Sequence, residues 1–172
     1  MELAHIPTEP VPVPPSIRPV LGTDEARPVW RNQLGGLTFA LGAPTPDRYV
    51  KWAPAGSPID LAAEAERLRW AAPFTPVPEV LDLDGDDAGS WLVTRALSGE
   101  TAVSARWTAD PARAVAAIGA GLRAFHDALP VEGCPFVVDA DARAASARSR
   151  IEGSRSRTPS STAWDIALSS ED

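Results

Sequence analysis

Lys51 is the only lysine in the chain, and it stands inside Arg48–Trp52, a segment whose alternating side chains are typical of a β-strand. In such a strand Tyr49 and Lys51 share one face, while Val50 and Trp52 share the other. An ammonium group on a rigid strand can bind phosphate oxygens as a point charge. A solvated lysine on an exposed sheet face is the ordinary alternative, so Lys51 by itself leaves both interpretations open.

Glu64 supplies a carboxylate close behind Lys51. The segment Asp60–Ala72 has apolar residues at helical spacing, and its first residue is a suitable N-cap. A carboxylate near the start of this helix can reach back to the strand and hold the lysine ammonium in place, as the strand–helix ion pair of kinases does. Glu66 is the rival, but Glu64 stands four residues before Leu68 and faces the sheet more closely. An ordinary surface charge paired with a neighbouring arginine is the alternative.

Three other motifs carry less chemistry. Gly35 and Gly36 are explained by a hairpin turn, and no G-x-G-x-x-G is present. The acidic stretch Asp82–Val93 lacks the glycine and the glutamate that a calcium loop needs at its sixth and twelfth positions. His126 and Asp127 end a predicted helix without a serine or cysteine nucleophile in sequence, so we interpret them as a helix cap or a surface pair.

The elements that position these residues follow a recognisable order. Besides the Arg48–Trp52 strand and the Asp60–Ala72 helix, strands are predicted at Arg27–Arg31, Leu37–Leu41, Val77–Leu83 and Trp91–Thr94, and helices at Asp110–Leu129 and Asp139–Ile151. A five-stranded antiparallel sheet with one helix between its third and fourth strands is the plan of a kinase small lobe. The sequence therefore predicts an α+β, protein-kinase-like small lobe followed by the first helices of an incomplete large lobe.

Composition excludes several classes of protein. The net charge of -7 argues against a nucleic-acid partner. One cysteine and two histidines make a disulfide framework or a zinc site improbable, and no metal ligands are assigned. No stretch reaches the ~18 apolar residues of a membrane span, and the N-terminus lacks the features of a secretory signal. A cytoplasmic location without a membrane partner is the resulting expectation.

In chain order, six segments resemble the aminoglycoside 3'-phosphotransferases, antibiotic kinases that share the protein-kinase fold. They are VWRNQLGGLTFAL, RYVKWAP, DLAAEAERLRW, FTPVPEVLDL, SWLVTRALSGETA and LRAFHDALPVEGCPF. The resemblance extends over about residues 17–151 and is specific through the combination of its segments. It implies an ATP-dependent transfer of phosphate to an aminoglycoside hydroxyl, and hence antibiotic resistance.

The same resemblance implies a nucleotide site for ATP. Lys51 would contact the α- and β-phosphates, and Glu64 would orient Lys51. The turn around Gly35, Gly36 and Leu37 would cover the phosphates.

For the base, the resemblance places the Tyr49 ring against adenine. Arg95, Ala96 and Leu97 would form the hinge and hydrogen-bond adenine through backbone groups.

One family motif is missing from the chain. The His-Gly-Asp-x-x-x-x-Asn loop with its catalytic Asp does not occur, nor does the later metal-binding Asp. No catalytic residue is therefore assigned, and Mg²⁺ is expected only in a full-length family member. We expect this chain to be C-terminally truncated, through a premature stop or a frameshift, and inactive as a phosphotransferase.

Four parts are predicted along the chain: a proline-rich arm at 1–16, the nucleotide-binding lobe and hinge at 17–97, the start of a helical lobe at 98–151, and a flexible tail without family features at 152–172. Two alternatives remain open at this point. The chain could be a non-catalytic nucleotide-binding or interaction module, or a fragment of a kinase for another hydroxylated small molecule.

Overall fold

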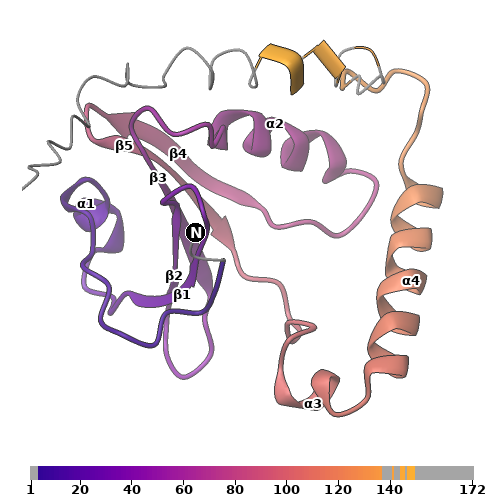
Figure 1. Cartoon of the computed structure of the whole chain (residues 1–172), viewed down its shortest axis with the longest axis horizontal. Coiled ribbons are helices and arrows are strands. Elements are labelled where there is room, and N and C mark those ends of the chain that lie inside the picture. The colour runs from indigo at the N-terminus through magenta and orange to yellow at the C-terminus, as the bar shows by residue number, and fades with distance from the viewer. Residues whose placement is uncertain (1–3, 137–140, 142–143, 146, 150–172) are drawn as a thin grey trace, which may run out of the picture. The chain divides into compact units, whose positions relative to one another are not determined.

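The structure of the protein is a computed structural model that describes residues 4–136, 141, 144–145 and 147–149 (Figure 1). The chain divides in two after Glu132, and the elements discussed here belong to the first part. In chain order they are η1 Pro15–Ile17, α1 Arg18–Leu21, β1 Arg27–Arg31, β2 Leu37–Leu41, β3 Arg48–Pro54, α2 Leu61–Ala71, β4 Val80–Asp86, β5 Gly89–Arg95, α3 Ala105–Thr108 and α4 Pro111–Ala128.

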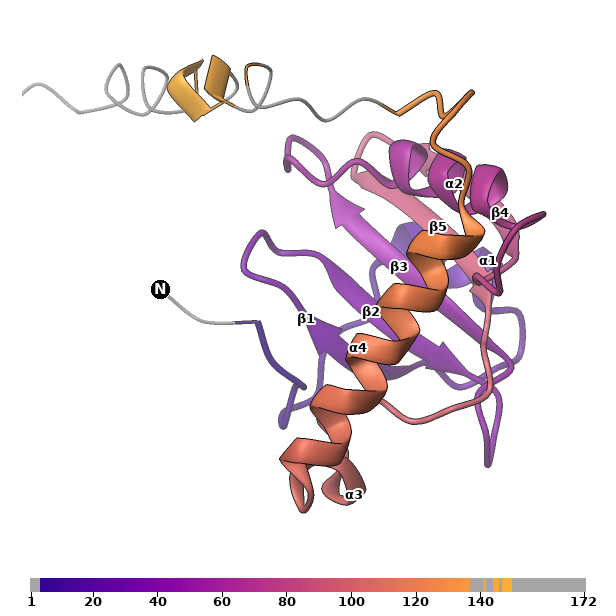
Figure 2. The ribbon, with the colours of Figure 1, turned by 90° about the vertical axis from the view of Figure 1, so that its right-hand side faces the viewer.

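The five strands form one antiparallel sheet in the order β1-β2-β3-β5-β4, which confirms the predicted α+β fold class (Figure 2). The helix α2 follows β3 in the chain and packs on β4 and β5. It therefore packs mainly on the β4 and β5 end of the strand order, away from β1. On that side of the sheet, the strands β1 and β2 are therefore candidates for a ligand-binding surface.

One face of the sheet is covered by the N-terminal segment. Ile17 and Leu21, from η1 and α1, pack against buried side chains that alternate along the strands, namely Phe39, Leu41, Val50, Trp91 and Val93. Val11, Val13, Val20 and Ala26 add to this first core cluster. Phe39, Val50 and Ile17 are fully buried, so the N-terminal segment is an integral layer of the fold.

The opposite face is covered by α2. Leu61 and Ala65 of this helix pack on Ala53 and Leu92, with Leu68 at the edge, and form a second core cluster. Figure 1 shows α1 and α2 on opposite sides of the sheet. Because side chains alternate along β3, Lys51 lies on the same face as Ala53 and therefore on the α2 side.

Aspartate side chains cap the N-termini of the two longer helices, and the cap at Asp60 was predicted. The Asp60 carboxylate accepts the Ala63 N–H at 2.8 Å, and the Asp110 carboxylate accepts the Arg113 N–H at 3.0 Å. Each carboxylate satisfies a backbone donor that the helix cannot satisfy itself. Pro111 takes the first position of α4, where its missing N–H costs nothing.

The fourth and fifth strands differ from their predicted bounds. β4 begins at Val80 and continues to Asp86, so Asp84 to Asp86 are paired residues of a hairpin and not a turn. Asp87 and Ala88 alone make the turn. The prediction was wrong here because Asp and Gly usually mark turns, whereas an edge strand tolerates them on its exposed positions.

The N-terminal region also contains more structure than predicted. The proline-rich arm meets the sheet edge at His5, which exchanges backbone hydrogen bonds of 3.0 and 2.9 Å with Arg31. The short helices η1, α1 and α3 were not predicted. Each spans at most four residues, too few to show helical periodicity.

The Asp86 carboxylate joins the N-terminal layer to the β4–β5 hairpin. It accepts a hydrogen bond from the Ser16 hydroxyl at 3.0 Å and from the Ala88 and Gly89 N–H groups at 2.9 and 3.1 Å. The hydrogen bond from Ser16, with those from the two N–H groups, lowers the pKa of Asp86 below its ordinary value.

Asp86→Ala is expected to lower the melting temperature by an amount that depends on pH. Because the folded-state pKa is depressed, the ionised carboxylate stabilises the fold above the unfolded-state pKa of about 4. That contribution is lost as pH falls through the folded-state pKa. Thermal melts of both proteins should therefore show a constant gap from pH 7 to 5 and a narrowing gap below about pH 4. A gap that widens on acidification would contradict the assignment.

The apolar stripe of α4 is exposed. Val115, Ile118, Leu122 and Phe125 keep between 37% and 69% of their surface accessible, while Ala114 is the one buried residue of the helix. A helix face that is exposed to water normally carries polar side chains, so four large apolar side chains on one exposed face are unusual. The predicted helix at 139–151 lies largely outside the described residues. None of the helices that the structure describes is long and apolar enough to cross a membrane.

Candidate functional site

Lys51 and Glu64 form an ion pair between the middle of β3 and the first turn of α2. The Lys51 ammonium donates to Glu64 Oε1, and the two side chains keep 38% and 36% of their surface exposed. A pair that is partly open to solvent can take up a third, anionic partner without leaving buried charges behind. The arrangement therefore holds a cation on a rigid strand and leaves it accessible to an anionic ligand.

The position of Glu64 follows from the start of α2. Asp60 caps the helix, so Glu64 occupies its first turn, where the helix dipole favours a negative charge. Ala65 and Leu61 are buried against the sheet and orient this face of the helix inward. Glu66 points to solvent, which resolves the choice between the two glutamates in favour of Glu64.

Side chains around Lys51 form a regular array. Directly paired residues of antiparallel strands place their side chains on one face. Trp30 pairs with Thr38, Thr38 with Lys51, and Lys51 with Leu92, so these residues make a row across four strands. Tyr49 lies in the next row, half-buried, on the same face as Lys51.

The β1–β2 turn is closed by its own hydrogen bonds. The Asn32 side-chain oxygen accepts the N–H groups of Leu34 and Gly36 at 2.9 and 2.8 Å, and the Asn32 carbonyl accepts the Gly35 N–H at 3.3 Å. These three donors are therefore not free to bind phosphate in this conformation. Sequence reasoning missed Asn32, although Asn before glycines is a signal for an Asx turn.

The glycines of this turn are needed for space as well as conformation. A Cβ atom on Gly36 would lie 2.6 Å from Asn32 Nδ2 and from Ile59 Cδ1, and Gly35 has a φ of 85°. Leu37, predicted with them, starts β2 and packs its side chain into the first core cluster. The side chain of Leu37 thus lies on the face away from Lys51.

The predicted hinge at Arg95–Leu97 is partly committed to the sheet. The Arg95 N–H donates to the Glu79 carbonyl at 2.9 Å, and the Ala96 N–H donates to the Asp47 carbonyl at 2.8 Å. In the part of the chain that the structure describes, the Leu97 N–H makes no hydrogen bond. Of the three N–H groups in this segment, that of Leu97 therefore remains available to a ligand.

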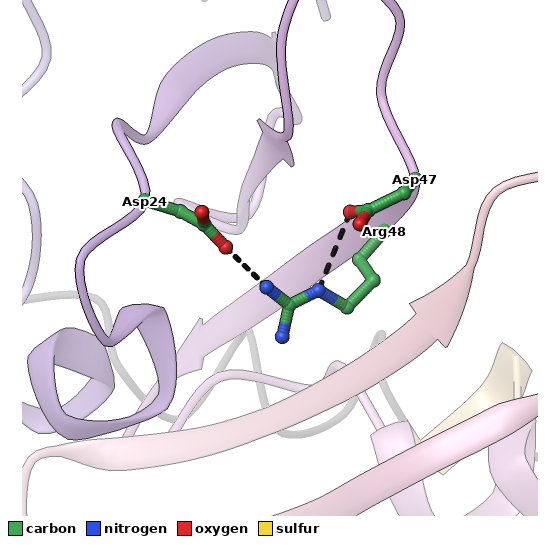
Figure 3. A network of polar contacts seen from close by, with 3 residues as sticks. All are labelled: Asp24, Asp47 and Arg48. Atoms are coloured by element: carbon green, nitrogen blue, oxygen red, sulfur yellow. Dashed lines mark hydrogen bonds and ion pairs between the residues drawn. The ribbon is translucent and has the colours of Figure 1, made fainter.

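A charged network holds the strand ends beside the predicted hinge. The Arg48 guanidinium donates to Asp24, which follows α1, and to Asp47 Oδ1 at 3.3 Å (Figure 3). On the other side, the hydrogen bond to Glu79 raises the pKa of Arg95, and the negative charge of Asp47 adds to the effect. Alternating charges thus link the N-terminal layer to the end of β5.

Metal ligands do not gather among the described residues. Within them, no group of three or more His, Cys, Asp or Glu side chains could hold a metal ion. His126 follows Phe125 near the end of α4, and Asp127 accepts a hydrogen bond from Arg123 one turn earlier at 2.9 Å. The Asp127 pairing is that of a surface charge.

Comparison with known proteins identifies relatives of this chain. A family model described as "Phosphotransferase enzyme family" matches residues 26–168, which reaches beyond Ile151, where the predicted resemblance ends. The aminoglycoside 3'-phosphotransferase of Streptomyces fradiae is 41% identical over 113 residues, covering 63% of this chain and 41% of that protein. The streptomycin 3''-kinase of Streptomyces griseus is 41% identical over 110 residues, covering 63% of this chain and 39% of that protein.

A solved structure shows the same fold. The aminoglycoside phosphotransferase APH(3'')-Id of Streptomyces rimosus superposes with a TM-score of 0.62 at 28% identity, over 80% of this chain and 49% of that one. The chain spans about half the length, or less, of the relatives that it matches. It belongs to the phosphotransferase enzyme family, and within it to the aminoglycoside phosphotransferases.

Proposed function

We propose that this chain forms the nucleotide-binding part of an ATP-dependent aminoglycoside phosphotransferase. The observation that carries the proposal is the Lys51–Glu64 pair, which presents a partly exposed lysine side chain on the α2 side of the sheet. ATP phosphates carry several negative charges, and a positioned cation is the main requirement for holding them. Glu64 keeps the ammonium in place before the nucleotide arrives.

Tyr49 and Leu97 supply the features that a base requires. The Tyr49 ring lies in the row next to Lys51, on the same face, and offers a surface for stacking. The free Leu97 N–H offers a donor to a ring nitrogen of the base. Along β3, Tyr49 and Lys51 are two residues apart, or about 7 Å, which suits a base and its phosphates.

The β1–β2 turn contributes differently from the expectation. Because Asn32 occupies its N–H groups, we propose that the turn covers the phosphates by shape and not by donating hydrogen bonds to them. The described residues hold no suitable metal-binding group, so we assign no Mg²⁺-dependent step to them.

The acceptor follows from the relatives and not from the described site. Two of these relatives are an aminoglycoside 3'-phosphotransferase and a streptomycin 3''-kinase. We propose an aminoglycoside hydroxyl as the acceptor for a protein that combines this segment with a catalytic loop. Since the His-Gly-Asp-x-x-x-x-Asn motif is absent from the printed sequence, we propose that this chain binds ATP without transferring its phosphate. The same absence favours a second candidate, a non-catalytic nucleotide-binding module.

Two measurements on the purified chain test the proposal. Isothermal titration with ATP and ADP should give one binding site per chain. Incubation with ATP, Mg²⁺ and kanamycin, neomycin or streptomycin should give no phosphorylated antibiotic by mass spectrometry. A folded chain that binds neither nucleotide would overturn the nucleotide site. Magnesium-dependent product above the level of a Lys51→Met variant would overturn the proposed inactivity.

A further inference from the structure

The edge strand β1 contains a bulge that decides where Trp30 points. Pro28 pairs with Phe39 of β2, and an unbroken register would then pair Trp30 with Leu37. The register shifts between Pro28 and Trp30 instead, so that Trp30 pairs with Thr38. A bulge of one residue moves the following side chain to the other face of the sheet. Trp30 thus leaves the side of the first core cluster and joins the side of Lys51.

An indole in this position is not explained by packing. Trp30 keeps 39% of its surface exposed, although burying it on the core side would stabilise the sheet. Among the residues that the structure describes, no partner accepts a hydrogen bond from the indole N–H of Trp30. The edge strand therefore places a large aromatic side chain with a free donor on the open face.

Trp30 also lies in line with Lys51. Thr38 separates them in the row, and two strand spacings put their Cα atoms about 10 Å apart. A nucleotide with its base at Tyr49 and its phosphates at Lys51 would run along β3, the strand that holds both residues. On the α2 side Lys51 is bounded by Glu64, and on the β1 side the small Thr38 side chain is followed in the row by Trp30.

Resting on the proposed function above, we propose that Trp30 is a further nucleotide-binding residue, which covers the ribose and phosphate chain of ATP at the β1 edge. An aromatic ring contributes contact area with few rotatable bonds, and its N–H can donate to a ribose or phosphate oxygen. Trp30 and Lys51 together suit a ribose phosphate, because Lys51 in the same row supplies a positive charge for the phosphate.

Titrations of ADP into Trp30→Ala, Trp30→Phe and Trp107→Ala test the proposal. Trp107 is a tryptophan of α3 that lies against Arg106 and Arg113, so its variant controls for loss of a tryptophan elsewhere. Trp30→Ala should raise the Kd for ADP roughly fivefold or more, whereas Trp30→Phe, which keeps a ring and loses the N–H donor, should raise it by a smaller factor. Trp107→Ala should bind as the wild type does.

Tryptophan accessibility gives a second reading that does not depend on affinity. ADP should protect one exposed tryptophan of the wild-type chain from acrylamide quenching, and this protection should disappear in Trp30→Phe. Unchanged ADP affinity in a folded Trp30→Ala, or protection that persists in Trp30→Phe, overturns the role of Trp30 and leaves the Lys51 site intact. A wild-type chain that binds no ADP overturns both, so the two failures are distinguishable.

Discussion

Lys51→Met is expected to weaken ATP binding by about ten- to a hundredfold while leaving the protein folded. Hydrogen bonds to charged groups contribute about 1.5–3 kcal/mol, and each 1.4 kcal/mol corresponds to a factor of about ten in Kd. Methionine preserves the apolar stem and removes only the ammonium. The Lys51–Glu64 pair is more than a third exposed, so its loss should change the free energy of unfolding by about 1 kcal/mol or less.

Isothermal titration of ATP together with a thermal melt separates these two effects. Arg69→Met is the matched control, since Arg69 lies exposed on the last turn of α2 and its removal changes the net charge equally. The control should bind ATP within about twofold of the wild type. An equal loss of affinity in both variants would show that only the overall charge matters, and would refute a specific phosphate contact at Lys51.

Glu64→Gln examines whether Glu64 acts through Lys51. If Glu64 positions the ammonium, the variant weakens ATP binding less than Lys51→Met does, and the double variant is no worse than Lys51→Met alone. If Glu64 only repels the phosphates, Glu64→Gln binds ATP more tightly than the wild type. The sign of the change thus decides between positioning and repulsion.

Phe39→Ala is expected to destabilise the fold by about 3–5 kcal/mol. Phe39 is fully buried in the first core cluster, between the sheet and the N-terminal layer, so truncation leaves a cavity that neighbours cannot fill. Most small domains have about 5–15 kcal/mol of stability in total, so this loss is a large fraction. Urea denaturation followed by circular dichroism measures the change.

Phe74→Ala provides the comparison. Phe74 follows α2, is 43% exposed and contacts Trp70 with ring centroids 5.7 Å apart. Its truncation should cost about 1 kcal/mol, as expected for an exposed aromatic pair. Similar losses for both phenylalanines would mean that the first core cluster is not packed as described.

Local signals were sufficient for the elements that hold the Lys51–Glu64 pair. The strands β1 and β2 match their predicted bounds because two alternating segments flank a glycine pair. The starts of α2 and α4 could be predicted at Asp60 and Asp110, because an N-cap is a contact between residues only three positions apart. The choice of Glu64 over Glu66 followed from helical periodicity alone.

The features that could not be predicted from the sequence depend on tertiary contacts. The covering role of Ile17 and Leu21 depends on a sheet that forms later in the chain. The commitment of the Ala96 N–H to Asp47 joins residues almost fifty positions apart. The face that Trp30 occupies depends on a one-residue bulge, and a pattern of period two carries no mark of where such a shift occurs.

The N-terminal layer has a consequence for how this protein can be divided. The sheet begins at β1, but the smallest piece able to fold on its own begins well before it, since Val11, Val13, Ile17 and Leu21 close the first core cluster. A fragment that starts at Arg27 would retain every residue of the proposed ATP site and yet expose Phe39, Leu41 and Val50 to water. The first residue that the proposed ATP site needs therefore lies well after the first residue that the core of the fold needs.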